Sequence, residues 1–274
     1  MRIGVFDSGI GGLTVFSALH NALPSHDLIY LGDTARVPYG TRSAETVTRY
    51  SCRVASYLWQ LQVEAIVIAC NTATTYALET LQKTAAPLGI QVFGVIEPGV
   101  EAALKQPHTA SIAVIGTPGT ISGGAYQAHL ARVAPEVTVT ATACPLFVPL
   151  AEEGWTTGEV PKLVAARYLT PLQGKVDTVI LGCTHYPLLR DAIQQCLPDA
   201  TLVDSASATA ALLHKVLHDA PSGTGERQFF VTDHIERFTR VGASFLGWSP
   251  EPVSWVDLGP AQGPFATACK PERR

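Results

Sequence analysis

Two cysteines end two similarly built apolar runs, and thiols are well suited to nucleophilic and proton-transfer chemistry. Cys70 ends the run 65–70 and Cys183 ends the run 178–183. Both runs are short and rich in β-branched residues, which is typical of buried parallel strands. Ligands of open α/β sheets bind at the carboxyl ends of the strands. The sequence therefore predicts one site with two reactive faces, each presented by a thiol.

Polar residues follow each of these thiols and set the two apart from ordinary buried cysteines. Asn71 and Thr72 follow Cys70, and Thr184 and His185 follow Cys183. Hydrogen bonds and a nearby histidine or helix N-terminus are the surroundings that make a thiol reactive. A small buried hydrophobic role suits the remaining cysteines better: Cys52, Cys144, Cys196 and Cys269. Because the spacing shows no disulfide framework, we expect all six to be free thiols in a reducing compartment.

Two opposed thiols suit the removal of a proton from one face of a carbon and its return to the other face. Asp7 follows the first predicted strand. It could carry protons beside one thiol, and His185 could do so beside the other. Two alternatives stay open: His185 could be a locally hydrogen-bonded core residue, or the base of a hydrolase or transferase whose only nucleophile is Cys183. The second alternative leaves Cys70 without a role.

The glycine-rich segment 7–12 follows a predicted strand and opens a helix, where backbone N–H groups form an anion site. A dinucleotide site is disfavoured, because the third glycine of G-x-G-x-x-G would fall at Thr14. A zinc site built on both cysteines and His185 lacks a fourth ligand and a closely spaced cysteine pair. We therefore expect no nucleotide cofactor and no metal.

The segment 37–43 also follows a strand and is typical of a loop that covers a substrate. Pro38 and Gly40 would fix a turn whose N–H groups could bind a carboxylate. An ordinary loop explains everything here except Tyr39. Glu152, further along, is by itself more typical of a solvated charge.

The rest of the chain alternates short apolar runs with longer amphipathic stretches. With 274 residues, 47% hydrophobic and 15% charged, it can form one large domain or two of ordinary size. Strands are expected at 2–6, 27–31, 64–69, 91–95, 111–115, 137–142, 176–181, 200–203 and 227–231. Helices are expected at 12–22, 43–62, 73–86, 98–106, 122–133, 158–171, 187–196, 206–218 and 234–246. This rhythm predicts parallel sheets with helices on both faces.

Two sheets fit the length better than one, with a break at 97–99 and a second crossing near Ser205. The segment 115–120 ends a strand of the second half much as the segment 5–9 does in the first, which suggests two related lobes. The tail from Trp248, rich in proline, is expected to be irregular.

Charge and targeting signals limit the possible partners. A net charge of −4 and a pI near 6.0 argue against nucleic-acid binding. The N-terminus lacks the features of a signal peptide, and no apolar run reaches the roughly 20 residues that cross a bilayer. We expect a cytoplasmic protein with no membrane contact.

Five motifs in family order resemble those of the glutamate racemases, in the cofactor-independent Asp/Glu racemase superfamily. They are 6–12, 33–42, 68–72, 144–154 and 181–187. Together they span the chain to about residue 190 and are highly specific as a set.

The resemblance implies two pseudo-symmetric α/β lobes, residues 1–97 with about 206–274 and residues 98–205, with the active site in the cleft between them. It implies interconversion of L- and D-glutamate without pyridoxal phosphate, for peptidoglycan, by a homodimer. Cys70 and Cys183 would each deprotonate one enantiomer. Asp7 and His185 would assist, and Glu152 would be an auxiliary acid–base or orienting group.

The resemblance also implies a set of substrate-binding residues: Asp7, Ser8, Pro38, Tyr39, Gly40, Asn71, Thr72, Thr117, Thr184 and His185. It does not imply dependence on a peptidoglycan-precursor activator, because activated relatives carry an N-terminal extension and this chain begins at its first strand. Two rivals remain: a related enzyme acting on aspartate or another small acid, and an amino-acid-binding protein without catalysis.

Overall fold

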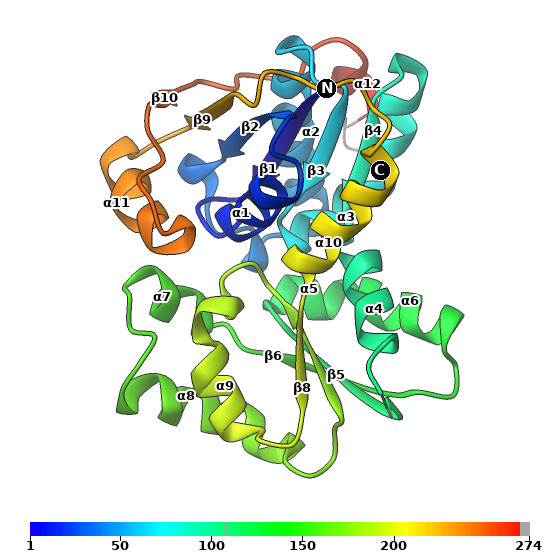
Figure 1. The fold of residues 1–274 in the computed structure, drawn as a ribbon, viewed down its shortest axis with the longest axis vertical. Coiled ribbons are helices and arrows are strands. Elements are labelled where there is room, and N and C mark those ends of the chain that lie inside the picture. Colours follow the sequence, from blue (N-terminus) through cyan, green and yellow to red (C-terminus); the bar gives the residue numbers. More distant parts are fainter. Residues whose placement is uncertain (108, 269–274) are drawn as a thin grey trace.

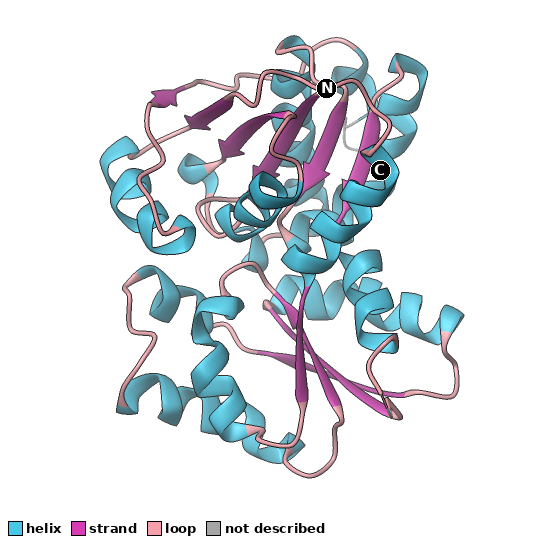
Figure 2. Ribbon diagram, viewed as in Figure 1, coloured by secondary structure: helices cyan, strands magenta, loops and turns pink. Residues whose placement is uncertain are grey.

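The strands of the protein form two separate parallel sheets, each covered by helices (Figures 1 and 2). The computed structural model describes residues 1–107 and 109–268. Every strand pairing in both sheets is parallel. The predicted fold class, α/β with mostly parallel sheets flanked by helices, is confirmed.

Sheet A has six strands in the order β10-β9-β2-β1-β3-β4. Their bounds are β1 Arg2–Asp7, β2 Asp27–Gly32, β3 Ala65–Ile68, β4 Gln91–Gly94, β9 Arg227–Val231 and β10 Val253–Trp255. One face packs against α1 (Leu13–Ala22), α10 (Ser205–Leu217) and α11 (Ile235–Leu246). The other face packs against α2 (Ala44–Gln60), α3 (Asn71–Ala85) and α12 (Pro264–Ala268). We call sheet A with these helices unit A.

Sheet B has four strands in the order β6-β5-β7-β8. Their bounds are β5 Ser111–Gly116, β6 Thr138–Ala143, β7 Thr178–Gly182 and β8 Thr201–Asp204. One face packs against α7 (Phe147–Glu152), α8 (Glu159–Leu169) and α9 (Arg190–Cys196), and the other against α4 (Ile96–Leu104) and α6 (Ala125–Val133). With α5 (Pro118–Gly123), which lies against β5 and β6, these elements form unit B.

Strand register brings the predicted site residues to the carboxyl edge of each sheet. Phe6 pairs with Ile68, and Ser8 and Cys70 each lie two residues beyond this pair. The two side chains therefore lie at the same edge of sheet A. Gly116 lies opposite Gly182, so Thr117 and Cys183 leave sheet B side by side. In Figure 1 the carboxyl ends of both sheets point toward the junction of the two units.

The predicted elements agree with the structure except in three places. All nine predicted strands form, but the tail expected to be irregular contains β10 and α12. The helix predicted at 122–133 is two helices, because Gly124 adopts a left-handed conformation between α5 and α6. The short helix α7 was not predicted. The predicted break at residues 97–99 coincides with the first turn of α4.

The boundaries of the two lobes, after residue 97 and before residue 206, stay a prediction. None of the described helices combines the length and the apolar character needed to cross a membrane.

The prediction of six free thiols is wrong for Cys52, which is disulfide-bonded. Cys70, Cys144, Cys183 and Cys196 are free, and Cys269 lies outside the described residues. A disulfide joins residues that the fold brings together, so spacing along the chain could not reveal it.

Candidate active site

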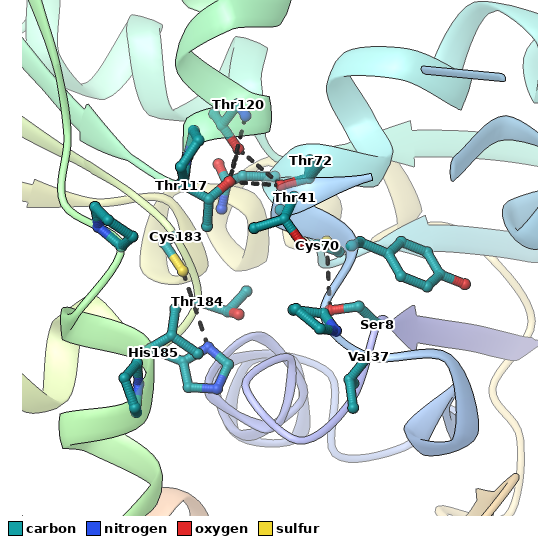
Figure 3. A pocket seen from close by; sticks show the side chains of 18 of the residues that line it. Ser8, Val37, Thr41, Cys70, Thr72, Thr117, Thr120, Cys183, Thr184 and His185 are labelled. Carbon is teal, nitrogen blue, oxygen red and sulfur yellow. Dashed lines mark hydrogen bonds between the residues drawn. The ribbon is translucent and has the colours of Figure 1, made fainter. Parts of the chain in front are cut away.

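A pocket of about 300 Å³ lies between the two units and is lined by both candidate thiols (Figure 3). Unit A contributes Ser8, Val37, Pro38, Tyr39, Gly40, Thr41, Cys70, Asn71 and Thr72. Unit B contributes Thr117, Pro118, Thr120, Pro145, Val148, Pro149, Glu152, Cys183, Thr184 and His185. The size is at the lower end of pockets that hold small-molecule ligands.

Every predicted site residue lines this pocket except Asp7, which is fully buried at the end of β1. Its Oδ2 accepts a hydrogen bond from the Gly9 amide at 2.9 Å, and its Oδ1 has no hydrogen-bond partner among the described residues. Burial raises the pKa of Asp7, although His185 and the backbone N–H groups of Gly9 and Gly12 act in the opposite direction. Asp7 can therefore influence the pocket through its charge and its proton, although it does not line the pocket.

Cys70 is held at the N-terminus of α3 and is 7% exposed. Its sulfur accepts a hydrogen bond from the Ala73 amide at 3.4 Å, and its thiol donates to Ser8 Oγ at 3.8 Å. Burial raises the pKa of the Cys70 thiol to about 12, and the charge of Asp7 acts in the same direction. The hydrogen bonds that Cys70 makes with Ala73 and Ser8 oppose this shift without reversing it. Cys70 is therefore held as a thiol.

Cys183, which is 6% exposed, begins a line of polar contacts through unit B. Its Sγ lies 3.9 Å from His185 Nδ1, and His185 Nε2 lies 3.0 Å from Glu152 Oε1. The other carboxylate oxygen, Glu152 Oε2, accepts a hydrogen bond from Arg237 Nη2 at 2.9 Å. The Glu152 carboxylate thus has one cationic partner on each oxygen when His185 is protonated.

The electrostatics of this line keep His185 charged. Burial alone would lower the pKa of His185, but its hydrogen bonds to Cys183 and Glu152 and their charges raise it to about 10. Burial alone would raise the pKa of Glu152, but His185 and Arg237 hold it below its usual range. At neutral pH the pair is an imidazolium and a carboxylate.

Arg237 is the member of this line of polar contacts that the sequence does not predict. It lies on α11 of unit A, 85 residues from Glu152, and its helix gave no signal beyond amphipathic spacing. Only the family resemblance predicts a role for Glu152, because the local sequence predicts no helix at α7. The motif 115–120 contained a further missed residue, Thr120.

Three threonine hydroxyls meet where the two units join. Thr72 Oγ1 of unit A lies 2.8 Å from Thr117 Oγ1 and 3.0 Å from Thr120 Oγ1. Figure 3 shows this cluster on one side of Cys183 and His185 on the other. Each hydroxyl can donate or accept a hydrogen bond, so the cluster can bind either a donor group or an acceptor group of a ligand.

Asn71 offers an unpaired donor beside this cluster. Tyr126 OH of unit B donates to Asn71 Oδ1 at 2.7 Å, which fixes the side-chain amide. Asn71 Nδ2 is buried and has no partner among the described residues. A buried donor without a partner is costly, so a ligand that accepts a hydrogen bond there would be stabilised.

Tyr39 fixes the loop that closes one wall of the pocket. Its hydroxyl donates to Asp33 Oδ2 at 2.7 Å, and its ring packs against Tyr50. Gly40 lies so close to unit B that a Cβ would come within 2.7 Å of Thr117 Cβ. The loop therefore contacts the opposite unit, as the prediction of a covering loop requires.

Among residues 1–107 and 109–268, no group of three or more histidine, cysteine or acidic side chains is arranged to hold a metal ion. The donor set of the pocket instead consists of two thiols, one imidazolium–carboxylate pair, hydroxyls and amides.

Comparison with known proteins places the chain in a family. A family model described as Asp/Glu/Hydantoin racemase matches residues 3–213. A glutamate racemase of Geobacter metallireducens is 51% identical over 263 residues, covering 93% of this chain and 96% of that protein. A glutamate racemase of Aquifex aeolicus is 50% identical over 252 residues, covering 92% and 96%.

The fold has close counterparts among solved structures. The structure of glutamate racemase from Francisella tularensis in complex with D-glutamate matches with a TM-score of 0.88 and 37% identity. The match covers 94% of this chain and 98% of that one. The chain therefore belongs to the Asp/Glu/hydantoin racemase family and groups within it with proteins named glutamate racemase.

Proposed function

We propose that this protein interconverts L- and D-glutamate by proton transfer between two thiols and the α-carbon, without a cofactor. The observation that carries the proposal is that Cys70 and Cys183 line one small pocket from opposite units. About half of the aligned residues are identical with those of proteins named glutamate racemase, and this similarity supports the choice of substrate.

In the proposed reaction one cysteine acts as a base and the other as an acid. The thiolate on one side removes the α-proton, which breaks the C–H bond and leaves the electron pair on Cα. The thiol on the other side gives its proton to the opposite face of Cα. Each turnover exchanges the thiol and thiolate states, and the reverse reaction begins from the exchanged state.

The neighbours of the two thiols carry protons between turnovers. His185 lies beside Cys183 and is held as an imidazolium by Glu152. Asp7 lies near Cys70, and its raised pKa makes it a better proton carrier than an ordinary carboxylate. We assign His185 to the Cys183 side and Asp7 to the Cys70 side.

The substrate groups match the donors that the pocket leaves free. Asn71 Nδ2 has no hydrogen-bond partner in the part of the chain that the structure describes, and the N-terminus of α3 directs backbone N–H groups toward the same space. Both features favour a carboxylate. We propose that these donors, the threonine hydroxyls, Ser8, Thr184 and the loop residues Pro38, Tyr39 and Gly40 bind the two carboxylates and the ammonium group.

We further propose that the product D-glutamate serves peptidoglycan synthesis in the cytoplasm and that the enzyme is a homodimer, as the family resemblance implies. Sedimentation analysis at micromolar concentration would test the dimer.

The test of the proposed function is incubation with L- or D-glutamate in D₂O, without added cofactor. We expect α-deuteration by NMR together with decay of the circular dichroism signal, at comparable rates from either enantiomer. Absence of exchange from both enantiomers would contradict the proposal. Faster exchange of aspartate than of glutamate would keep the mechanism and change the substrate.

A further inference from the structure

Arg237 belongs to unit A but bonds to a residue of the opposite unit. Its helix α11 is anchored in the core of unit A by Phe238 and Phe245. Its guanidinium donates to Glu152 Oε2 at 2.9 Å and lies 3.9 Å from Glu153 Oε1, both in unit B. The Arg237 side chain is 42% exposed and does not line the pocket.

The Glu152 carboxylate depends on this contact for its position. Glu152 is the last residue of α7, which is only six residues long. Its two oxygens are held by His185 on one side and by Arg237 on the other. Without Arg237, Oε2 would have no hydrogen-bond partner among residues 1–107 and 109–268, and the 18% exposed carboxylate could turn toward water.

The imidazole of His185 is in turn positioned by α11 in two ways. Glu152, held by Arg237, accepts the hydrogen bond of Nε2. Phe245, two turns further along α11, packs edge-on against the ring with centroids 5.5 Å apart and planes at 88°. These two contacts direct Nδ1 toward Cys183 Sγ, which lies 3.9 Å away.

Cys70 does not share these contacts. Its hydrogen-bond partners are Ser8 and the Ala73 amide. Neither of them has a hydrogen bond to Glu152 or Arg237 among the described residues. Through hydrogen bonds, a change at Arg237 should therefore reach Cys183 and not Cys70.

We propose that Arg237 is a positioning residue for proton transfer at Cys183: it holds Glu152, and Glu152 orients His185 toward the thiol. This inference rests on the proposed two-thiol racemisation. It predicts an effect confined to one face of the substrate, whereas a general role in joining the two units would affect both faces.

Single-cysteine variants separate the two faces. In Cys70→Ala only Cys183 can exchange the α-proton with D₂O, and in Cys183→Ala only Cys70 can do so. Each background can be combined with Arg237→Met, Arg237→Lys or Arg240→Met. Arg240 lies on the same helix, is exposed and has no hydrogen bond or ion pair among the described residues, so it is a matched control for the lost charge.

We expect Arg237→Met to slow deuteration of glutamate roughly tenfold to a hundredfold in the Cys70→Ala background, because the imidazole loses its fixed orientation. In the Cys183→Ala background the change should stay within about twofold, as for independent sites. Arg237→Lys should restore most of the lost exchange, and Arg240→Met should change neither background.

An equal loss in both backgrounds, or no loss in Cys70→Ala, would overturn the role of Arg237. The Cys183→Ala background also serves as the folding control, since misfolding would abolish its exchange too. If neither parent background exchanges either enantiomer, the proposed function itself is overturned, and this inference with it.

Discussion

The two thiols that line the pocket have neighbours of opposite charge. Cys70 lies near the Asp7 carboxylate, and burial together with that charge raises its pKa to about 12. Cys183 lies beside the imidazolium of His185. A cation favours a thiolate and an anion disfavours it. The unliganded protein should therefore rest with Cys70 as a thiol.

The ion pair between Glu152 and His185 should make stability depend on pH. The pKa of His185 is raised from 6.5 to about 10, so its contribution is complete below pH 6.5 and disappears as the pH rises through 10. The pKa of Glu152 is lowered from 4.5, so its contribution is complete above pH 4.5 and disappears as the pH falls through the lowered value. Both contributions are complete between pH 4.5 and 6.5.

We therefore expect Glu152→Gln to lower the free energy of unfolding most within that window, by about 1.5–3 kcal/mol, the size of a hydrogen bond to a charged group. Urea denaturation of both proteins between pH 4 and 10 measures the difference. It should shrink steadily above pH 6.5. A difference that stays constant up to pH 10 would mean that His185 is not held as an imidazolium.

At the scale of elements, the turn between β1 and α1 supports the site through its glycines, which leave room for neighbouring side chains. A Cβ on Gly11 would overlap the His185 ring and Thr184 Oγ1 of the opposite unit. A Cβ on Gly12 would lie 2.5 Å from Asp7 Cβ. The glycines of the segment 7–12 thus allow unit A to approach the histidine beside Cys183 closely.

Gly11→Ala should reduce racemisation at least roughly tenfold, because the new methyl group displaces His185. Overpacking should also cost about 1–3 kcal/mol of stability. Gly99→Ala is the matched control: its Cβ would meet nothing nearer than 3.5 Å, so both activity and stability should stay close to those of the unsubstituted protein. Full activity in Gly11→Ala would show that the position of His185 does not matter.

Local patterns predicted the elements whose signals are local. Buried strands such as β3 and β7 are continuous apolar runs, and both thiols follow from the positions where those runs end. α7 escaped prediction because six residues contain too little periodicity. The Arg237–Glu152 contact and the disulfide of Cys52 join segments that only the fold brings together, and no pattern around either residue could indicate them.

At the scale of the whole molecule, the pocket exists only because the two units meet. Thr14 Oγ1 of unit A donates to the Thr184 carbonyl oxygen of unit B at 3.1 Å, and Tyr76 OH of unit A donates to the Gly119 carbonyl oxygen at 2.8 Å. A ligand in the pocket would add contacts to both units at once. Its binding should therefore stabilise the whole chain.

An equimolar mixture of L- and D-glutamate, whose composition racemisation cannot change, should raise the melting temperature. At a hundred times the dissociation constant the expected stabilisation is about 2.7 kcal/mol, or roughly 5–10 °C for a chain of this size. Differential scanning fluorimetry measures the shift, with aspartate at the same concentration as the comparison. An equal or larger shift with aspartate would contradict glutamate as the preferred substrate.

The central claim is that Cys70 and Cys183 act on opposite faces of one carbon, and single-cysteine variants test it most directly. Cys70→Ala and Cys183→Ala are incubated separately with each enantiomer of glutamate in D₂O, and α-deuteration and chirality are followed together. We expect each variant to deuterate one enantiomer with retention, the two variants to choose opposite enantiomers, and neither to racemise. Racemisation by either variant, or the same enantiomer labelled by both, would contradict the two-thiol account.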